Sequence, residues 1–217
     1  MIVYVAHQKG GVGKSTVSIN VAYILAKMLQ DIAILDLDSQ HSSKLFNELR
    51  KQNDLNCVDC FTANDIDFNL FISKYKGNKE NILIVDSGGY DNDVNRSALV
   101  KADIIITPVG ISQIEIFGLQ KFRNILKEAS IAMDKNIKTH ILLNNVDPRS
   151  KKSIESLQEY IQENNKHFIL LDTVLHSRAD YKTSYGEGLT VGELNQNSKA
   201  TQEIKALSNE IFNLVLK

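Results

Sequence analysis

The chain of 217 residues has no apolar run that approaches the roughly 20 residues needed to cross a bilayer. Its start lacks the basic segment and long apolar stretch of a secretory signal peptide. No linker, internal repeat or low-complexity segment divides it. These absences argue against a membrane-bound or exported protein, and we expect one cytoplasmic domain over residues 1–217.

Neither positive nor negative charge is in large excess, and the chain has few cysteines. The net charge is -1 and the pI is about 6.5, so a surface that is basic all over is excluded and any DNA contact must come from a local patch. The two cysteines form a single C-x-x-C, Cys57-Val58-Asp59-Cys60, with no second pair. Its alternating pattern predicts a short strand, although half of a metal or redox site stays open.

Apolar runs alternate with segments of helical periodicity along the whole chain. Strands are predicted over residues 2–6, 32–38, 56–61, 81–86, 104–109, 139–145 and 168–175. Helices are predicted over residues 17–29, 42–52, 65–74, 94–101, 114–132, 152–164, 179–186 and 199–216. Strands separated by helices predict right-handed crossovers, and therefore a doubly wound α/β fold whose mainly parallel sheet is covered on both faces.

A glycine-rich segment lies between the first predicted strand and the first predicted helix. It reads Gln8-Lys9-Gly10-Gly11-Val12-Gly13-Lys14-Ser15-Thr16. Glycines let backbone N–H groups approach an anion, and the helix that starts near Lys14 points its positive end at it. Lys14 would contact the β- and γ-phosphates, and the Ser15 hydroxyl would ligate Mg²⁺. The stretch from Gly10 to Thr16 is therefore predicted to bind MgATP.

Lys9 departs from the standard G-x-x-x-x-G-K-[ST] loop, in which glycine stands at the position of Gln8. Because Lys14 and Mg²⁺ already neutralise the local phosphates, we expect Lys9 to contact a different phosphate, that of a partner subunit. The loop resembles the deviant Walker A motif [KR]-G-G-x-G-K-[ST] of the ParA/MinD ATPases. The resemblance implies that Lys9 reaches across an ATP-sandwiched homodimer to the other subunit's nucleotide.

Carboxylates end two predicted strands. Asp86 follows four apolar residues, which is the position expected of a Walker B aspartate that reaches Mg²⁺ through water. The run Asp36-Leu37-Asp38-Ser39-Gln40 resembles the D-x-D-P-Q switch of the family. By that resemblance Asp36 supports the Mg²⁺ shell and Asp38 orients the attacking water. We expect neither of these two to serve only as a cap for the next helix.

The chain departs from the family at both switches. Ser39 replaces a proline, and Gly88-Gly89 stand where the family usually has proline. Because glycine carries no side chain, Gly88-Gly89 would let the backbone approach the γ-phosphate and sense ATP.

Polar residues in the last third of the chain predict two further contacts, one with adenine and one with DNA. Asn144 ends a strand at the carboxyl edge of the sheet, where ligands of doubly wound folds bind, and by resemblance it contacts adenine. Turn chemistry explains the following Asp147-Pro148 equally well. Arg178 and Lys182 are four residues apart, so we expect them to share one helical face. With Lys199 they would form a patch that binds DNA phosphates without reading sequence.

The resemblance covers essentially the whole chain and implies a small ParA-like partition ATPase. Such a protein dimerises with MgATP, binds nonspecific DNA on the nucleoid, and returns to the monomer after slow, partner-stimulated hydrolysis to ADP and phosphate. Since the phosphate loop lies near the start of the sequence, we expect a separate ParB-like or adaptor protein to recognise the centromere or other cargo.

Two alternatives stay open. A MinD-like division regulator should end in an amphipathic basic segment that binds membrane, whereas residues 210–217 have one terminal lysine and resemble a core-facing helix. The other alternative is an iron–sulfur carrier or reductase component of the same fold, which would use Cys57 and Cys60 across a dimer.

Overall fold

A computed structural model describes residues 1–29, 31–77, 80–89 and 92–216. Within these residues, seven parallel strands form one sheet in the order β3-β2-β4-β1-β5-β6-β7. The strands are β1 (Ile2–Val5), β2 (Asp31–Asp36), β3 (Asp59–Thr62), β4 (Asn81–Asp86), β5 (Ile104–Val109), β6 (Thr139–Val146) and β7 (Phe168–His176). The predicted parallel sheet and its seven strands are confirmed.

The predicted helices are also confirmed, with shifts of a few residues at their ends. They are α1 (Lys14–Leu25), α2 (Ser42–Gln52), α3 (Phe68–Tyr75), α4 (Asp93–Lys101), α5 (Gln113–Ala132), α6 (Lys151–Glu163), α7 (Asp180–Gly186) and α9 (Lys199–Leu216). Sequence periodicity missed the 3-10 turn η1 (Ala63–Asp65) and α8 (Val191–Leu194) because segments this short carry no helical repeat. Over the described ranges, no helix is long and apolar enough to span a membrane.

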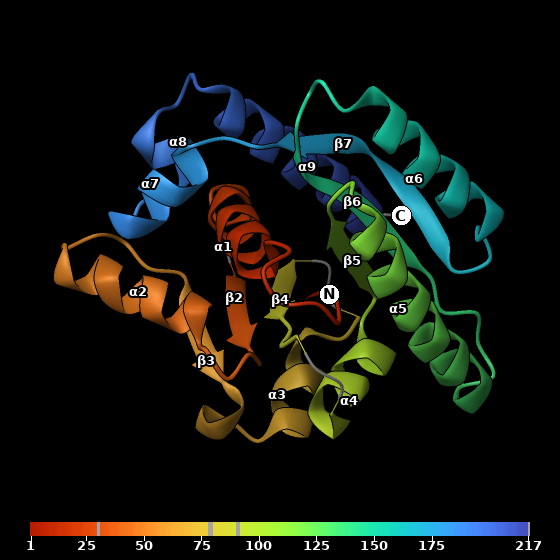
Figure 1. Ribbon diagram of the computed structural model, residues 1–217. Helices are drawn as coiled ribbons and strands as arrows, with labels where there is room; N and C mark the ends of the chain where they lie inside the picture. Colours follow the sequence, from red (N-terminus) through yellow and green to blue (C-terminus); the bar gives the residue numbers. More distant parts are fainter. Residues whose placement is uncertain (30, 78–79, 90–91, 217) are drawn as a thin grey trace.

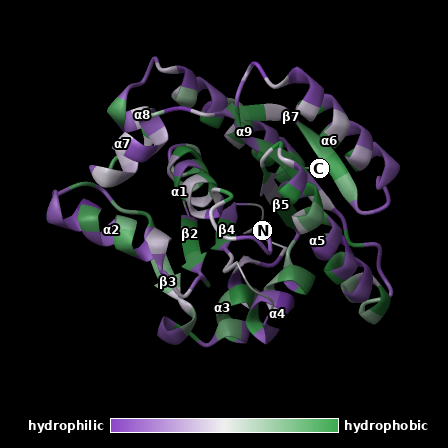
Figure 2. Cartoon of the chain, viewed as in Figure 1, coloured by the Kyte–Doolittle hydropathy of each residue, from purple (hydrophilic) through white to green (hydrophobic). Residues whose placement is uncertain are grey.

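The helices form two layers on opposite faces of the sheet (Figure 1). Alternate residues of β1 belong to different cores: Ile2 and Tyr4 face one cluster, Val3 and Val5 the other. The first cluster is closed by α3, α4, α5 and α6, the second by α1, α9 and one side of α2. Buried on both faces, the inner strands are continuous hydrophobic runs, which Figure 2 shows in green. The outer surfaces of the helices carry most of the purple, hydrophilic residues.

The strand order makes β1 the point at which the chain changes direction across the sheet. β1 lies between β4 and β5, while β2 lies beyond β4. The loops that leave β1, β2 and β4 therefore meet at the carboxyl edge of the sheet. Ligands of doubly wound folds bind at such a switch point.

Among the described helices, α3, α4 and α8 begin with a side-chain cap, but α1 does not. Asp67 accepts a hydrogen bond from Leu70 N (3.0 Å) at the start of α3, and Asn92 accepts one from Asn95 N (2.7 Å) at α4. The cap residue of α1 is Gly13, which has no side chain, and the first turn contains no acid. The positive end of α1 is therefore available to an external anion.

Candidate nucleotide site

The loop between β1 and α1 has the backbone shape of an anion cradle. Gly11 and Gly13 have φ angles of 77° and 93°, which a residue with a side chain adopts only under strain. A Cβ atom at Gly13 would lie 2.3 Å from Asn144 Nδ2, and one at Gly89 would lie 3.2 Å from Gly10 N. The loop is therefore held tightly between the ends of β4 and β6. Glycine is required at Gly13 and Gly89 because a side chain there would collide with the neighbouring segment.

One cavity of about 580 Å³ brings most of the predicted nucleotide residues together. Its wall includes the phosphate loop, the first turn of α1, the loop after β2, and α7. The residues that line it are Gly10, Gly11, Gly13, Lys14, Ser15, Thr16, Asp38, Gln40, Ser42, Tyr181, Lys182 and Tyr185. The remaining loop residue, Val12, is buried. The cavity is large enough for a nucleotide-sized ligand.

Lys14 is the cation at the centre of this cavity. It is only 6% exposed, and its Nζ donates a hydrogen bond to Lys9 O (3.1 Å). Burial lowers the pKa of Lys14, while the carboxylates of Asp86 and Asp38 oppose that shift. A buried ammonium aimed at a glycine loop is poorly compensated by the protein alone and gains from an anionic ligand.

Asp86, at the end of β4, is fully buried, as is Asp36. Burial, with the nearby charge of Asp36, raises the pKa of Asp86 to about 7. One oxygen accepts the Ser43 hydroxyl hydrogen bond (2.8 Å), while Oδ1 has no partner among the described protein atoms. An orphaned buried carboxylate oxygen fits a cation, so the donor set suits Mg²⁺.

Asp36 lies beside Asp86 in the register of β2 and β4, but its oxygens are already used. They accept backbone hydrogen bonds from Asp38 N (3.1 Å), Ser43 N (2.9 Å) and Lys44 N (3.1 Å). Asp36 therefore holds the start of α2, and the expectation that it does more than cap this helix stays a prediction. The cause of these contacts is the αL turn at His41, which brings the first N–H groups of α2 back to the end of β2. Its support of the Mg²⁺ shell stays a prediction.

Asp38 differs from Asp36 in remaining accessible. It is partly exposed and lines the cavity with Lys14, and the one donor to its carboxylate within the described residues is Gln40 N, which bonds Oδ1 (3.0 Å). The second carboxylate oxygen is therefore free to meet a water molecule in the cavity. The two carboxylates of this run thus have different surroundings, as expected for residues two apart at a strand end.

Lys9 does not extend into solvent. Its ammonium group is hydrogen-bonded to Glu115 Oε1, in the first turn of α5, and its backbone N–H donates to His7 Nδ1 (2.9 Å). The Lys9 side chain is 36% exposed and that of Glu115 11%. Sequence reasoning missed Glu115, because a carboxylate 106 residues away gives no local signal.

Asn144 lies behind the phosphate loop. Its Nδ2 donates a hydrogen bond to Val12 O (2.6 Å), so part of its amide is committed to holding the loop. The neighbouring cavity of about 350 Å³ is lined by Asn144, Asn145 and Arg178, together with the loop glycines. The contact of Asn144 with adenine stays a prediction.

The three residues of the predicted DNA patch are in different settings. α7 begins at Asp180, so Arg178 precedes it and the expectation that Arg178 and Lys182 share one helical face is wrong. Arg178 NH2 donates to Glu203 Oε1 (2.6 Å), an ion pair that only a contact between β7 and α9 creates. Lys182 and Lys199 are exposed, and Lys182 also lines the cavity. Their DNA contacts stay predictions.

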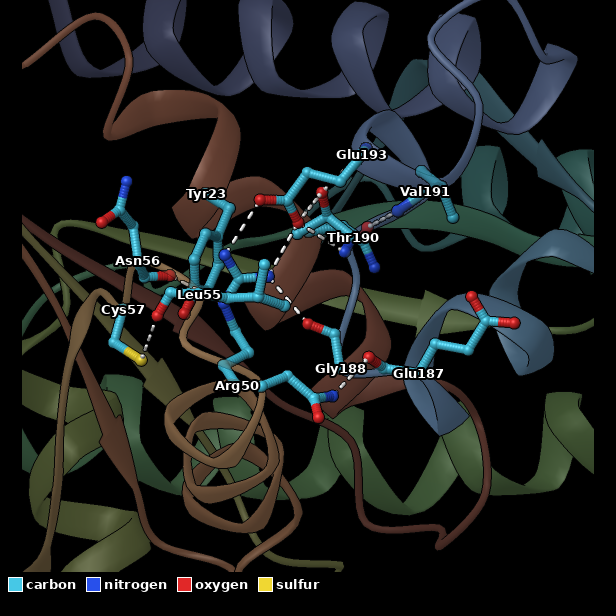
Figure 3. A network of polar contacts seen from close by, with 12 residues as sticks. Tyr23, Arg50, Leu55, Asn56, Cys57, Glu187, Gly188, Thr190, Val191 and Glu193 are labelled. Atoms are coloured by element: carbon cyan, nitrogen blue, oxygen red, sulfur yellow. Dashed lines mark hydrogen bonds and ion pairs between the residues drawn. The ribbon is translucent and has the colours of Figure 1, made fainter.

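A buried arginine, which the sequence did not single out, ties α2 to the segment around α8 (Figure 3). Arg50 is 1% exposed; its guanidinium pairs with both carboxylate oxygens of Glu193 (2.8 and 2.9 Å) and donates to Gly188 O (2.8 Å). It also lies 4.3 Å from the ring centroid of Tyr23. The adjacent Tyr185 hydroxyl donates to Ser42 O (2.9 Å). Together these contacts fix the cavity wall formed by α2 and α7.

Neither cysteine lines the two cavities of this site. Cys57 is exposed, Cys60 lies in β3, and both thiols are free. Burial raises the pKa of the Cys60 thiol to about 12, which disfavours the thiolate that a metal requires. Among the described residues, no three His, Cys, Asp or Glu side chains gather to hold a metal ion on their own. A cation at Asp86 would therefore need ligand oxygens from a bound phosphate.

A doubly wound parallel sheet with a glycine-rich anion loop, a buried lysine and a carboxylate on the adjacent strand defines a phosphate-loop nucleotide-binding protein. The chain belongs to the CobQ/CobB/MinD/ParA nucleotide-binding domain family, whose profile matches residues 3–191.

Known relatives span almost the whole chain. The virulence plasmid ParA family protein pGP5-D of Chlamydia trachomatis is 26% identical, over 95% of this chain and 92% of its own. The maintenance of carboxysome distribution protein A of Halothiobacillus neapolitanus is 23% identical, over 96% and 94%. Among solved structures, the ATP complex of Cyanothece McdA(D38A) superimposes with a TM-score of 0.74 at 13% identity, covering 97% and 95%. The Mg-ADP complex of the septum site-determining protein MinD of Pyrococcus horikoshii OT3 gives 0.69 at 17%, covering 97% and 95%.

Proposed function

We propose that the chain, as one ATPase domain over residues 1–217, is a ParA-like partition ATPase that couples MgATP-dependent dimerisation to DNA binding. The observation that carries this proposal is the pair of lysines in one loop. Lys14 is buried in the cavity that Asp38 lines, whereas the Lys9 side chain lines a separate pocket beside α5, where Glu115 holds its ammonium group. One nucleotide needs only the first of them.

The phosphate loop and Lys14 would bind the triphosphate, because the N–H groups at the start of α1 and the buried Lys14 ammonium are donors that a phosphate can accept from. Ser15 and Asp86, with support from Asp36, would hold Mg²⁺, which neutralises negative charge on the phosphate oxygens. The orphaned Asp86 Oδ1 supports this assignment. The cavity beside Asn144 and Arg178 is the space into which the base would extend.

Hydrolysis would depend on Asp38. Its accessible carboxylate oxygen accepts a hydrogen bond from water and aims the water oxygen at the γ-phosphorus, while the bond from that phosphorus to the bridging oxygen breaks. The products are ADP and phosphate. Because phosphoryl transfer needs mainly positioning and charge stabilisation, one carboxylate with Lys14, Lys9 and Mg²⁺ suffices.

Lys9 would complete the site across a dimer. To reach a second subunit's phosphate, its ammonium must exchange the Glu115 carboxylate for phosphate oxygens. That exchange is favourable only when both subunits hold ATP, since an empty partner offers no anion. Dimerisation would therefore follow ATP binding and end after hydrolysis.

DNA binding would use Lys182 and Lys199, with Arg178 if its pair with Glu203 opens. Cation–phosphate contacts of this kind are independent of sequence, so a ParB-like or adaptor protein would supply the cargo and stimulate turnover. The nucleoid is accordingly the proposed location.

The test is light scattering with ATP on an Asp38→Ala background, followed by mobility-shift assays on arbitrary duplexes. Lys9→Ala should keep MgADP binding but lose the dimer. Lys199→Glu should keep the dimer and weaken DNA binding, and the affinity of the parent should fall steeply with salt. If Lys9→Ala leaves the dimer intact, the cross-subunit role is wrong.

A second candidate is a protein-positioning ATPase, favoured by the similarity to the carboxysome distribution protein. Absence of DNA binding by the ATP-bound dimer at low salt would favour a protein-positioning role. Iron in the purified protein would instead favour the iron–sulfur alternative.

A further inference from the structure

His7, two residues before Lys9, occupies an unusual position for a polar side chain. It is 2% exposed, and its Nδ1 accepts the hydrogen bond from Lys9 N (2.9 Å). The ring is neutral near pH 7, because burial and the charges of Lys14 and Lys9 lower the pKa of His7 to about 4. A neutral imidazole that accepts at Nδ1 carries its proton on Nε2. That Nε2–H has no acceptor among the described protein atoms.

The ring of His7 also contacts α5, the helix that carries Glu115. A Cβ atom at Gly118 would lie 2.8 Å from His7 Cε1, so the helix backbone approaches the ring directly. On the same helix, Phe122 stacks with His7 at 6.4 Å between ring centroids. His7 therefore lies between the backbone of Lys9 and the helix that holds the Lys9 side chain.

A second orphaned polar group lies nearby, at the end of β4. Ser87 directly follows Asp86, is 2% exposed, and its Oγ has no partner among the described protein atoms. His7 and Ser87 line one small cavity of about 20 Å³. A cavity of about 10–15 Å³ already holds one water molecule, provided that polar partners are present. An Nε2–H donor and a hydroxyl are such partners.

We propose that His7 is a positioning residue for Lys9: it fixes the Lys9 backbone through Nδ1 and is joined through one buried water to Ser87 Oγ. The orientation of Lys9 then follows the position of the turn after β4, which lies against the phosphate loop at Gly89 and Gly10. This inference rests on the cross-subunit role of Lys9 in the proposed function.

The experiment measures ATP-dependent dimerisation by light scattering, on the Asp38→Ala background, for His7→Phe, Ser87→Ala and the double variant. His7→Phe keeps a ring but removes both nitrogens. The matched control is His167→Phe, which removes another buried histidine, one that contacts Ile137 O (2.9 Å). Ser87→Ala should weaken the dimer about three- to tenfold, the usual effect of one net hydrogen bond, and His7→Phe, which removes two hydrogen bonds, at least as much. MgADP affinity should stay within about twofold of the parent value.

A double-mutant cycle separates positioning from general destabilisation. Because both side chains act through one water, Ser87→Ala should add nothing on the His7→Phe background, whereas independent effects would multiply. Nitrogen-15 NMR of the parent protein should show the His7 tautomer with the proton on Nε2. Multiplying effects, the opposite tautomer, or an unchanged dimer would overturn the inference.

Lys9→Ala, measured in parallel, distinguishes failure of the inference about His7 from failure of the cross-subunit role of Lys9. If Lys9→Ala abolishes the dimer while His7→Phe and Ser87→Ala do not weaken it, only the inference about His7 fails. If Lys9→Ala dimerises normally, the cross-subunit lysine fails and the inference falls with it. Should His7→Phe fail to fold, dimerisation of Ser87→Ala and the tautomer of His7 in the parent protein test the inference.

Discussion

Replacing Glu115 with glutamine should tighten the ATP-dependent dimer. Glu115 holds the ammonium of Lys9 inside its own subunit, and the Glu115 side chain is only 11% exposed. Glutamine keeps the shape and one acceptor oxygen but removes the charge. The change therefore weakens the contact that competes with the phosphate of a second subunit.

The size of the effect follows from the contact itself. Hydrogen bonds that involve a charged group contribute about 1.5–3 kcal/mol; the ammonium–carboxylate bond belongs at the top of this range and the ammonium–amide bond of the variant at the bottom. Since the Lys9 side chain is 36% exposed, solvent screening reduces the difference to about 1 kcal/mol. Both subunits must release Lys9, so the dimer gains about 2 kcal/mol, or roughly 30-fold in its dissociation constant.

Sedimentation equilibrium with ATP, on the Asp38→Ala background, measures this constant. The matched control is Glu128→Gln on the same helix, because Glu128 pairs with Arg96 (3.3 Å) at an exposed position. Glu115→Gln should dimerise more tightly, and the control should match the parent. An unchanged or weaker dimer, or an equal gain in the control, would refute the idea that Glu115 retains Lys9.

Three further predictions concern the site and its support. Gly13→Ala should abolish nucleotide binding in calorimetry, because φ is 93° and the added Cβ meets Asn144 Nδ2 at 2.3 Å; normal affinity would mean that the loop adjusts freely. Lys14→Ala should lose MgATP binding while its melting temperature holds or rises, since a buried charge is removed; retained affinity would reject the assignment. Arg50→Met should lower unfolding stability by about 1–3 kcal/mol in urea titrations, because Gly188 O loses its buried donor and the Glu193 carboxylate, which keeps its bonds from Thr190, loses its cationic partner; adding Glu193→Gln should restore part of that loss.

Local patterns in the sequence determined the fold and the centre of the site. The buried parallel strands are uninterrupted apolar runs, such as that ending at Asp86, and need no distant information to be recognised. The glycines of the phosphate loop are equally local, because a positive φ at Gly13 is a property of one residue and its neighbours. Parallel strands bring their carboxyl ends to one edge, where Lys14, predicted to contact phosphate, and Asp38, which the family resemblance assigned to the attacking water, line one cavity.

Only the tertiary structure decided how the remaining polar side chains are used. Lys9 meets Glu115 106 residues away, and Arg50 meets Glu193 143 residues away, through packing of elements that are not adjacent in the chain. Arg178 was expected on a helical face but pairs with Glu203, because β7 ends beside α9. A charged side chain reaches several partners from one backbone position, and the choice among them is made by the helices packed around it rather than by its neighbours in sequence.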